Sequence, residues 1–373
     1  MSTTLTTQAS AAVHADRLHR AQAEMAGQGI DLLIVGPSPD LFYLIGYEGH
    51  ESERLSVLVL PRAGQAHYVV PRLEMALLDG KEDLLRLTPW AETEQPAAVL
   101  AGVAGDAAHG VIAVNDDLWS VFLLRLQQAM PQARWVEAGQ LLRPLRMRKD
   151  AAEVATMAEV ARLTDETWDE FIQQPVAGLT ELEVKERLEA ALRARGVQPA
   201  FCIVASGPHS ASPHHVAGSR VIQAGDALAV DWGGTLGGYY SDVTRSAHVG
   251  QPSAEYQRAY AAVLAANEAA FAAVRPGVAC EEIDRAARDL LTAEGYGEAF
   301  FHRVGHGLGL AVHEEPYLVA GNDLPLAEGM VFSDEPGVYF PGAFGIRIED
   351  TVVVTADGGE KLNHATRDLT ILE

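Results

Sequence analysis

Residues 228–245 read Leu228-Ala229-Val230-Asp231-Trp232-Gly233-Gly234-Thr235-Leu236-Gly237-Gly238-Tyr239-Tyr240-Ser241-Asp242-Val243-Thr244-Arg245, and this stretch predicts a β-hairpin. An apolar run enters a glycine-rich turn, and a second run of high β-propensity leaves it. With the turn centred on Leu236-Gly237, Asp231 and Asp242 lie directly opposite each other on one face, with Cβ atoms about 5 Å apart. Carboxylates that close in an apolar hairpin repel each other and resist ionisation. We therefore expect a cation between them.

The composition is that of a folded globular protein. Of the 373 residues, 48% are hydrophobic and 21% are charged, which argues against a disordered chain. The formal net charge of -23 opposes binding to nucleic acid or to an anionic membrane surface, so neither is an expected partner. Residues 1–15 lack the apolar segment of a signal peptide, and no run reaches the roughly 20 apolar residues of a membrane span. Two cysteines, Cys202 and Cys280, are too few for a disulfide scaffold. We expect a cytoplasmic protein.

The first part of the chain, residues 1–147, reads as a separate α/β domain. Its helix-prone and strand-prone segments alternate, which predicts a sheet flanked by helices. The predicted helices are Ala12–Gln28 and Asp116–Met130, and the predicted strands are Asp31–Val35, Arg54–Pro61, Gln65–Pro71, Gly110–Val114 and Arg134–Glu137. No motif in this domain carries chemistry. Its loop at residues 46–51 either is solvated or reaches a site elsewhere.

The second part, residues 148–373, follows a basic break at Leu142–Asp150 that contains Pro144. Asp150 caps a helical pattern that runs to about Gln174. The next helix, Thr180–Arg195, opens on the capping box Thr180-Glu181-Leu182-Glu183. Beyond the central hairpin, Ser253–Val274 and Cys280–Glu294 predict two more helices. This domain therefore contains a helix pair on either side of the hairpin.

Four further clusters in this second domain carry residues with possible chemistry. They are the three-histidine loop Phe201–His215, the glycine-rich segment Phe300–Pro316, the segment Val331–Phe340 and the segment Gly345–Thr355. Glu335 and Glu349 are opposed if a second hairpin turns at Gly342. Taken singly, each residue has an ordinary structural explanation, such as a turn for an Asp beside Gly or a loop for His306 between glycines.

The combination of these residues is harder to explain structurally. Four carboxylates, Asp231, Asp242, Glu335 and Glu349, would lie with the imidazole of His306 on apolar hairpins, with a formal charge of about -4. Two divalent cations cancel this charge, whereas the cluster alone would destabilise the fold. A dinuclear site with bridging carboxylates and an activated water is a known use of such a set.

The contexts of these five residues resemble the pita-bread metallopeptidases. The contexts are Val-Asp-Trp-Gly-Gly, Ser-Asp-Val-Thr-Arg, Gly-His-Gly-Leu-Gly, Asp-Glu-Pro-Gly-Val-Tyr and Arg-Ile-Glu-Asp. The likeness is greatest to the Xaa-Pro dipeptidase (prolidase) and aminopeptidase P branch. It implies a creatinase-like N-terminal α/β domain, residues 1–147, followed by a pita-bread catalytic domain, residues 148–373.

The resemblance also implies roles for the site residues. Asp231 would chelate one metal, His306 and Glu335 the other, and Asp242 and Glu349 would bridge the two. His214 and His313 match the two catalytic-site histidines of the family, although the adjacent His215 could face the site in place of His214. Arg347 lies two residues before Glu349 and so on the same face of a strand, where it could orient a ligand carboxylate.

These roles imply a metal-bridging hydroxide that hydrolyses the Xaa-Pro bond, with Glu335 carrying the proton and His214 or His313 stabilising the oxyanion. One histidine among four carboxylates favours Mn²⁺, with Co²⁺ or Zn²⁺ as alternatives. The expected substrates are small peptides with proline at the second position, most simply dipeptides. An aminopeptidase P that trims longer peptides is the alternative, because Tyr317 stands where related dipeptidases often have a cation. Relatives of this kind also imply a homodimer.

Overall fold

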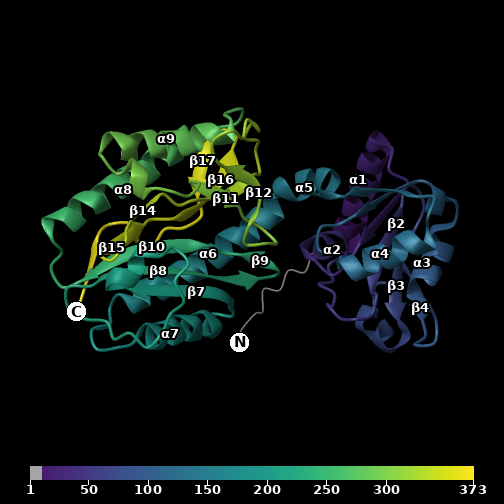
Figure 1. The fold of residues 1–373 in the computed structure, drawn as a ribbon, viewed down its shortest axis with the longest axis horizontal. Coiled ribbons are helices and arrows are strands. Elements are labelled where there is room, and N and C mark those ends of the chain that lie inside the picture. The colour runs from purple at the N-terminus through teal and green to yellow at the C-terminus, as the bar shows by residue number, and fades with distance from the viewer. Residues whose placement is uncertain (1–10) are drawn as a thin grey trace. The chain divides into compact units, whose positions relative to one another are not determined.

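The computed structural model describes residues 11–373, which form two compact units, residues 11–146 and residues 147–373 (Figure 1). The first unit contains a six-stranded sheet in the order β4-β3-β2-β1-β5-β6. Its strands are β1 (Leu32–Val35), β2 (Val57–Pro61), β3 (Ala66–Pro71), β4 (Leu85–Trp90), β5 (Val111–Val114) and β6 (Arg134–Glu137). Its helices are α1 (Ala11–Gln28), α2 (Pro39–Ile45), α3 (Pro96–Ala104), α4 (Ser120–Ala129) and α5 (Gly139–Met147), with short 3₁₀ turns at Arg72–Leu78 and Gly105–His109. All four residues of the central strand β1 are buried, as expected for a strand covered on both faces.

The two units divide within the predicted break at Leu142–Asp150, between residues 146 and 147, but most of that segment is helical because it belongs to α5. Leu141, Leu142 and Leu145 are buried at helical spacing, and their burial retains a helix despite the internal Pro144. Tertiary packing therefore outweighs the local helix-breaking signal here.

The second unit consists of two sheets, each with a helix pair packed against it. The first sheet has the order β18-β10-β8-β7, with β9 paired to β8, and the second has the order β12-β11-β13-β16-β17. The strands of the first are β7 (Gln198–Ser206), β8 (Ala227–Leu236), β9 (Tyr239–Tyr240), β10 (Val243–Val249) and β18 (Thr370–Leu372). Those of the second are β11 (Gly305–Gly307), β12 (Glu314–Leu318), β13 (Val331–Asp334), β16 (Asp350–Thr355) and β17 (Gly358–Lys361). A separate hairpin joins β14 (Gly337–Phe340) to β15 (Phe344–Arg347).

The helices of this unit are α6 (Ala151–Phe171), α7 (Glu181–Ala194), α8 (Ala254–Ala273) and α9 (Cys280–Ala293), with short 3₁₀ turns at Gly207–Ala211 and Gly297–Ala299. The helix cap predicted at Asp150 and the capping box predicted at Thr180 are both confirmed, at the starts of α6 and α7, and the cap at Asp150 is also a capping box, with Glu153. In Figure 1, α7 lies below the strands of this unit and α8 and α9 lie above them. Two apolar cores result, one between α6, α7 and the first sheet and one between α8, α9 and the second.

The central hairpin forms, but its predicted register was wrong. The two turn residues are Gly237 and Gly238, both at positive φ (59° and 86°), so Asp231 pairs with Thr244 rather than with Asp242. Two-residue turns of this type need positive φ at both positions, which favours glycine at both. The shift preserves the alternation of faces, since Asp242 then falls opposite Gly233, two residues from Asp231. The two carboxylates remain on one face as diagonal neighbours.

The second hairpin has the register predicted from a turn at Gly342. Gly337 pairs with Arg347 in the β14–β15 ladder, and the same register continues in the β13–β16 ladder, where Asp334 pairs with Asp350. Glu335 and Glu349 oppose each other in the gap between the two ladders. Their backbone N–H groups donate instead to Val304 and Thr244, at 2.8 and 3.1 Å. These two hydrogen bonds therefore connect the hairpin to β10 of the first sheet and to the residue before β11 of the second.

Among residues 11–373, no helix is both long enough and apolar enough to cross a membrane.

Candidate active site

The five residues predicted as metal ligands come together between the two sheets of the second unit. Asp231 lies on β8, Asp242 precedes β10, His306 lies on β11, Glu335 follows β13, and Glu349 precedes β16. His306 Nε2 is 3.3 Å from Glu335 Oε1 and 3.6 Å from Asp242 Oδ2. One potential ligand atom from each of Asp242, His306 and Glu349 lies within 4.8 Å of the others, and all three residues are buried. The strand pairing thus assembles residues that are more than 100 positions apart.

Glycines on either side of His306 allow neighbouring strands to approach it. A Cβ atom on Gly305 would lie 1.8 Å from the carbonyl oxygen of Ser333, and one on Gly307 would lie 2.3 Å from that of Glu315. Both distances are far below any real contact, so only glycine permits this packing. The Gly-His-Gly sequence is therefore a requirement for placing the imidazole between β12 and β13.

Arg347 is the cation in direct contact with this cluster. Its Nη2 donates to Asp231 Oδ2 at 2.5 Å, its Nε donates to Thr244 Oγ1 at 3.0 Å, and Nε lies 3.9 Å from Glu335 Oε2. Its Nη1 donates to the hydroxyl of Tyr339 at 3.2 Å. The predicted role of Arg347 beside a ligand carboxylate thus matches a direct contact with Asp231.

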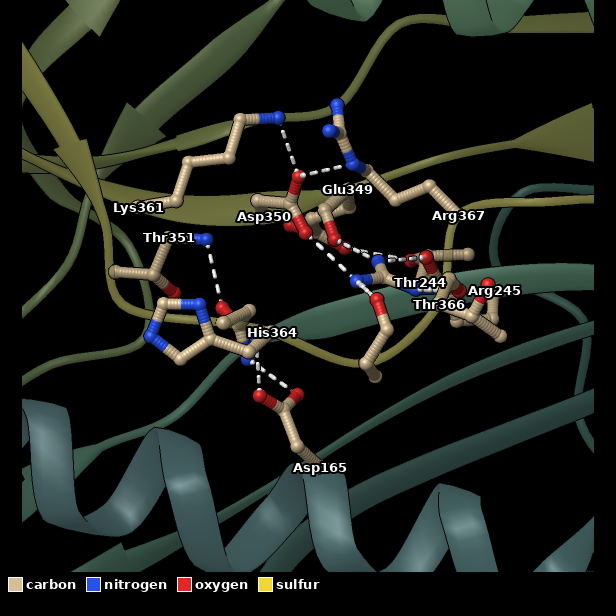
Figure 2. Close-up of polar contacts among 12 residues, drawn as sticks. Asp165, Thr244, Arg245, Glu349, Asp350, Thr351, Lys361, His364, Thr366 and Arg367 are labelled. Carbon is tan, nitrogen blue, oxygen red and sulfur yellow. Dashed lines mark hydrogen bonds and ion pairs between the residues drawn. The ribbon is translucent and has the colours of Figure 1, made fainter.

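A buried network of hydrogen bonds and ion pairs fixes the position of Glu349, as Figure 2 shows. Thr244 Oγ1 donates to Glu349 Oε2 at 2.5 Å, and Arg245 Nη1 donates to the carbonyl oxygen of Glu349. Arg245 also pairs with Asp350 at 2.7 Å, and Lys361 pairs with the other oxygen of Asp350 at 2.6 Å. Asp350 and Arg245 are each 1% exposed, so the pair sits in a low-dielectric interior where such contacts hold geometry firmly. Glu349 is fixed by its side chain and by its backbone.

The pKa values in the cluster reflect negative charges that neighbouring cations do not balance. Burial raises the pKa of Asp242 and of Glu349 well above the usual carboxylate range, and neighbouring carboxylates raise both further. Burial also raises the pKa of Glu335 to about 7, against the opposing charge of Arg347. Burial lowers the pKa of His306 to about 3, so its imidazole is neutral near pH 7, which is the form that ligates metals.

These residues fit a site for divalent cations. Asp231 Oδ1 is buried and has no hydrogen-bond partner within residues 11–373, while its Oδ2 is bound by Arg347. A buried carboxylate oxygen without a donor is costly unless a cation faces it. Four carboxylates and a neutral imidazole offer the mostly hard, oxygen-rich ligand set that Mn²⁺ accepts.

Of the two adjacent histidines, His215 is held away from this cluster. Its Nε2 donates to Glu181 Oε2 at 2.8 Å, and the other oxygen of Glu181 contacts His209 at 2.9 Å. The charge of His214, in contrast, acts on Asp231, where burial raises the pKa while Arg347 and His214 oppose that rise. Of the two alternatives left open by the sequence, His215 is thus engaged by Glu181, which favours His214 as the histidine available to the site. Glu181, His209 and His215 form a separate polar cluster beside it.

The ring of His313 lies next to the ligand set. Its centroid is 4.0 Å from that of His306, with an edge-to-face arrangement, and the residue is exposed. Burial lowers the pKa of His313, and the charges of Arg303 and His214 lower it further. An exposed neutral imidazole at this position can contact a bound substrate.

Three polar residues of the site were missed by sequence reasoning: Thr244, Tyr339 and His302. The hydroxyl of Tyr339 is 3.1 Å from His302 Nε2 and also accepts from Arg347. Thr244 could have been found from the correct hairpin register, since it pairs with Asp231. No local signal marks Tyr339 and His302, because their contact depends on how β14 packs against the segment before β11.

Comparisons with known proteins agree over nearly the whole chain. The model of metallopeptidase family M24 matches residues 155–356, and that of the creatinase/prolidase N-terminal domain matches residues 17–148. A probable dipeptidase PepE of Mycobacterium tuberculosis is 43% identical over 97% of both chains. Among solved structures, a prolidase from Thermococcus sibiricus has a TM-score of 0.92 at 35% identity and covers 96% of this chain and 99% of its own. An X-Pro aminopeptidase from Thermotoga maritima has a TM-score of 0.80 at 30% identity, with 92% and 98% covered.

Proposed function

The chain belongs to metallopeptidase family M24, and from this premise we propose that it is an Xaa-Pro dipeptidase that uses two divalent metal ions, preferentially Mn²⁺. The proposal rests on how the potential ligand atoms converge: one atom from each of Asp242, His306 and Glu349 lies within 4.8 Å of the others. In addition, Glu335 Oε1 lies 3.3 Å from His306 Nε2, and Oδ1 of Asp231 has no hydrogen-bond partner among the described residues. Asp231, Asp242, His306, Glu335 and Glu349 are the proposed ligands. When bound there, the ions supply Lewis acidity that polarises a carbonyl and lowers the pKa of an attacking water.

The remaining chemistry falls to side chains of this protein. Glu335 accepts a proton from the attacking water and returns it to the departing proline nitrogen, a role open to a carboxylate that lies 3.3 Å from the proposed ligand His306. His214 and His313 donate hydrogen bonds to the oxygen of the scissile carbonyl as negative charge develops there. Arg347 holds Oδ2 of Asp231 and leaves Oδ1 without a hydrogen-bond partner among the described residues, so Oδ1 is the oxygen that would hold a metal ion.

Proline at the second position is supported by the names of the relatives and by the chemistry of the bond. The Xaa-Pro bond is a tertiary amide without an N–H group, so a dedicated site has to recognise the ring and the polar groups around it. The solved X-Pro aminopeptidase with TM-score 0.80 favours one alternative, an aminopeptidase P acting on longer peptides.

The test is to remove metal with a chelator, and then to assay an Xaa-Pro dipeptide and an Xaa-Pro-Yaa tripeptide before and after adding Mn²⁺ or Co²⁺. We expect no hydrolysis without metal and restored hydrolysis with it, faster for the dipeptide. Full activity in the metal-free sample would reject the metal-dependent mechanism. Preference for the tripeptide would favour the aminopeptidase alternative.

A further inference from the structure

A second group of metal-binding side chains lies outside the proposed ligand set. Glu181 begins α7, His209 lies on the 3₁₀ turn Gly207–Ala211, and His215 follows that turn. One potential ligand atom from each of the three lies within 4.8 Å of the others. Glu181 Oε1 is 2.9 Å from His209 Nδ1, and Glu181 Oε2 is 2.8 Å from His215 Nε2. This cluster shares no residue with the five proposed ligands of the dinuclear site.

The carboxylate of Glu181 is held in place by donors other than the two histidines. Its Oε1 accepts from the backbone N–H of Ser206 at 2.9 Å and from the Ser206 hydroxyl at 2.8 Å. Its Oε2 accepts from the backbone N–H of Gly218 at 3.2 Å. Such outer donors orient the carboxylates that ligate metals. The position of Glu181 therefore does not depend on the protons of His209 and His215.

This carboxylate is fully buried, and its charge is not balanced by a direct ion pair with Lys or Arg. The side chain of Glu181 is 0% exposed, and among residues 11–373 no Lys or Arg nitrogen lies within 4.0 Å of it. The guanidinium of Arg220 pairs instead with Asp226 at 2.6 Å. A carboxylate that accepts several hydrogen bonds stays ionised, and a buried charge is most stable with a cation beside it. The two imidazoles occupy the positions where that cation would be bound.

Both imidazoles can offer a lone pair to a cation by changing tautomer. The ring nitrogens away from Glu181 are Nε2 of His209 and Nδ1 of His215, and neither has a hydrogen-bond partner among the described residues. Each can therefore carry the ring proton, which frees the nitrogen that faces Glu181 to act as a ligand. Ligand atoms about 2 Å from a tetrahedral ion lie roughly 3–3.5 Å apart, so the imidazoles need to move only slightly. The side chain of His209 is 43% exposed, which gives an ion access from solvent.

We propose that Glu181, His209 and His215 bind one Zn²⁺, separately from the dinuclear site, with water in the fourth position. Two imidazole nitrogens and one carboxylate oxygen form a three-ligand set used by zinc sites. Imidazole ligands favour Zn²⁺ over Mn²⁺, whereas the oxygen-rich dinuclear set suits Mn²⁺. The ion would join α7 to the loop that carries His214, and binding to the folded state alone would stabilise the protein. The inference does not depend on peptidase activity.

The experiment counts the Zn²⁺ and the Mn²⁺ ions bound per full-length chain, by elemental analysis after chelation and equilibrium dialysis against each metal. The variants are His209→Asn and His215→Gln, whose side-chain amides can replace the N–H groups that face Glu181. They preserve these hydrogen bonds, but an amide nitrogen has no lone pair for Zn²⁺. The control is His364→Gln, which replaces an exposed histidine of the same unit outside both clusters. Tm is measured for each protein with and without metal.

We expect the wild type to bind one more Zn²⁺ than Mn²⁺ per chain. His209→Asn and His215→Gln should each lose this additional Zn²⁺ and bind the same number of Mn²⁺ ions as the wild type. Their metal-free Tm should match that of the wild type, because the hydrogen bonds to Glu181 remain. The rise in Tm with Zn²⁺ should be smaller in both variants, since one stabilising ion is missing. His364→Gln should behave as the wild type.

Three results would overturn the inference. The first is a wild type that binds equal numbers of Zn²⁺ and Mn²⁺ ions. The second is undiminished Zn²⁺ binding in folded His209→Asn and His215→Gln, which would show that the additional ion binds elsewhere. The third is loss of Mn²⁺ together with Zn²⁺ from these variants, which would show that the cluster only supports the dinuclear site. None of these results decides whether the protein hydrolyses Xaa-Pro bonds, which the dipeptide assay tests separately.

Discussion

Charge balance at single residues dominates the behaviour of the site. Three carboxylates lie close to His306, a fourth belongs to Asp231, and Arg347 is the only cation hydrogen-bonded to one of the four among the described residues. Buried uncompensated charge costs several kcal/mol, so the metal-free state is disfavoured whenever these groups are ionised. Both predictions at this scale follow from that imbalance.

The first prediction separates ligands from substrate-contacting residues. Asp242→Ala and Glu349→Ala should each lose most bound metal, because each removes an oxygen from the cluster around His306. His313→Ala should retain metal and lose roughly 100- to 1,000-fold in kcat, since it removes a donor to the developing oxyanion. Metal analysis beside steady-state kinetics checks both. Depletion of metal from His313→Ala to the level of the other two would show that the roles are wrongly assigned.

The second prediction concerns the pH dependence of stability without metal. Folding raises the pKa of Glu335 from 4.5 to about 7 and raises those of Asp242 and Glu349 as well. A carboxyl group with a raised folded-state pKa stabilises the fold fully below its unfolded pKa, and this stabilisation is lost as the pH rises through about 7. The Tm of metal-free protein should therefore fall between pH 5 and pH 8, and added Mn²⁺ should raise Tm more at pH 8.

Differential scanning fluorimetry at the two pH values provides the measurement, with Glu349→Gln as the control variant. That substitution removes one of the raised carboxyl groups, so its metal-free Tm should depend less on pH. An equal Mn²⁺-induced shift at pH 5 and pH 8 would contradict the charge argument.

The two hairpins are the elements that carry most ligands, and close backbone packing determines their geometry. A Cβ atom on Gly233 would lie 2.0 Å from the carbonyl oxygen of Ser241 and 2.7 Å from the Phe201 ring. Gly233 is also opposite Asp242 by the register of the hairpin. Backbone cannot yield to such a contact without separating the strands that present Asp231 and Asp242.

We therefore predict that Gly233→Ala destabilises the protein by about 1–3 kcal/mol, the usual cost of overpacking, and weakens metal binding. The matched control is Gly237→Ala in the turn, where an added Cβ meets only Thr156 at 3.6 Å and the cost is the positive φ alone. Chemical denaturation and metal titration would measure both effects. Comparable metal affinity in the two variants would show that strand separation does not reach the carboxylates.

For the whole molecule, the open question is what the first unit contributes. The second unit holds all five proposed ligands, whereas no motif with chemistry was found in residues 1–146. A domain in this situation can restrict a site sterically and exclude water. We hypothesise that the protein is a homodimer and that the loop at residues 47–51 limits the length of the peptides that it hydrolyses.

Shortening this loop should increase hydrolysis of longer Xaa-Pro peptides relative to dipeptides, while bound metal stays constant because no ligand is touched. Light scattering would measure the oligomeric state, and a series of peptides of increasing length would measure the preference. Unchanged length preference in a folded, metal-loaded loop variant would eliminate this gating role and leave selection to the second unit.

The amino-acid sequence was sufficient to identify the strongest local features. The helix cap at Asp150, the capping box at Thr180, the turn at Gly342 and the family of the chain were all predicted correctly, because each depends on residues close together in sequence or on contiguous motifs. Helix caps and tight turns are decided by local backbone hydrogen bonds and by positive φ, which the residue types reveal.

Tertiary structure decided how distant segments meet. It selected the Gly237-Gly238 turn over its neighbour, kept Pro144 within a helix by burying the leucines around it, and bound His215 to Glu181. It also placed Arg303 on Tyr317 and Tyr339 between Arg347 and His302. These contacts join strands and loops far apart in the chain, and their energies depend on burial and on the full set of neighbours, which no local pattern encodes.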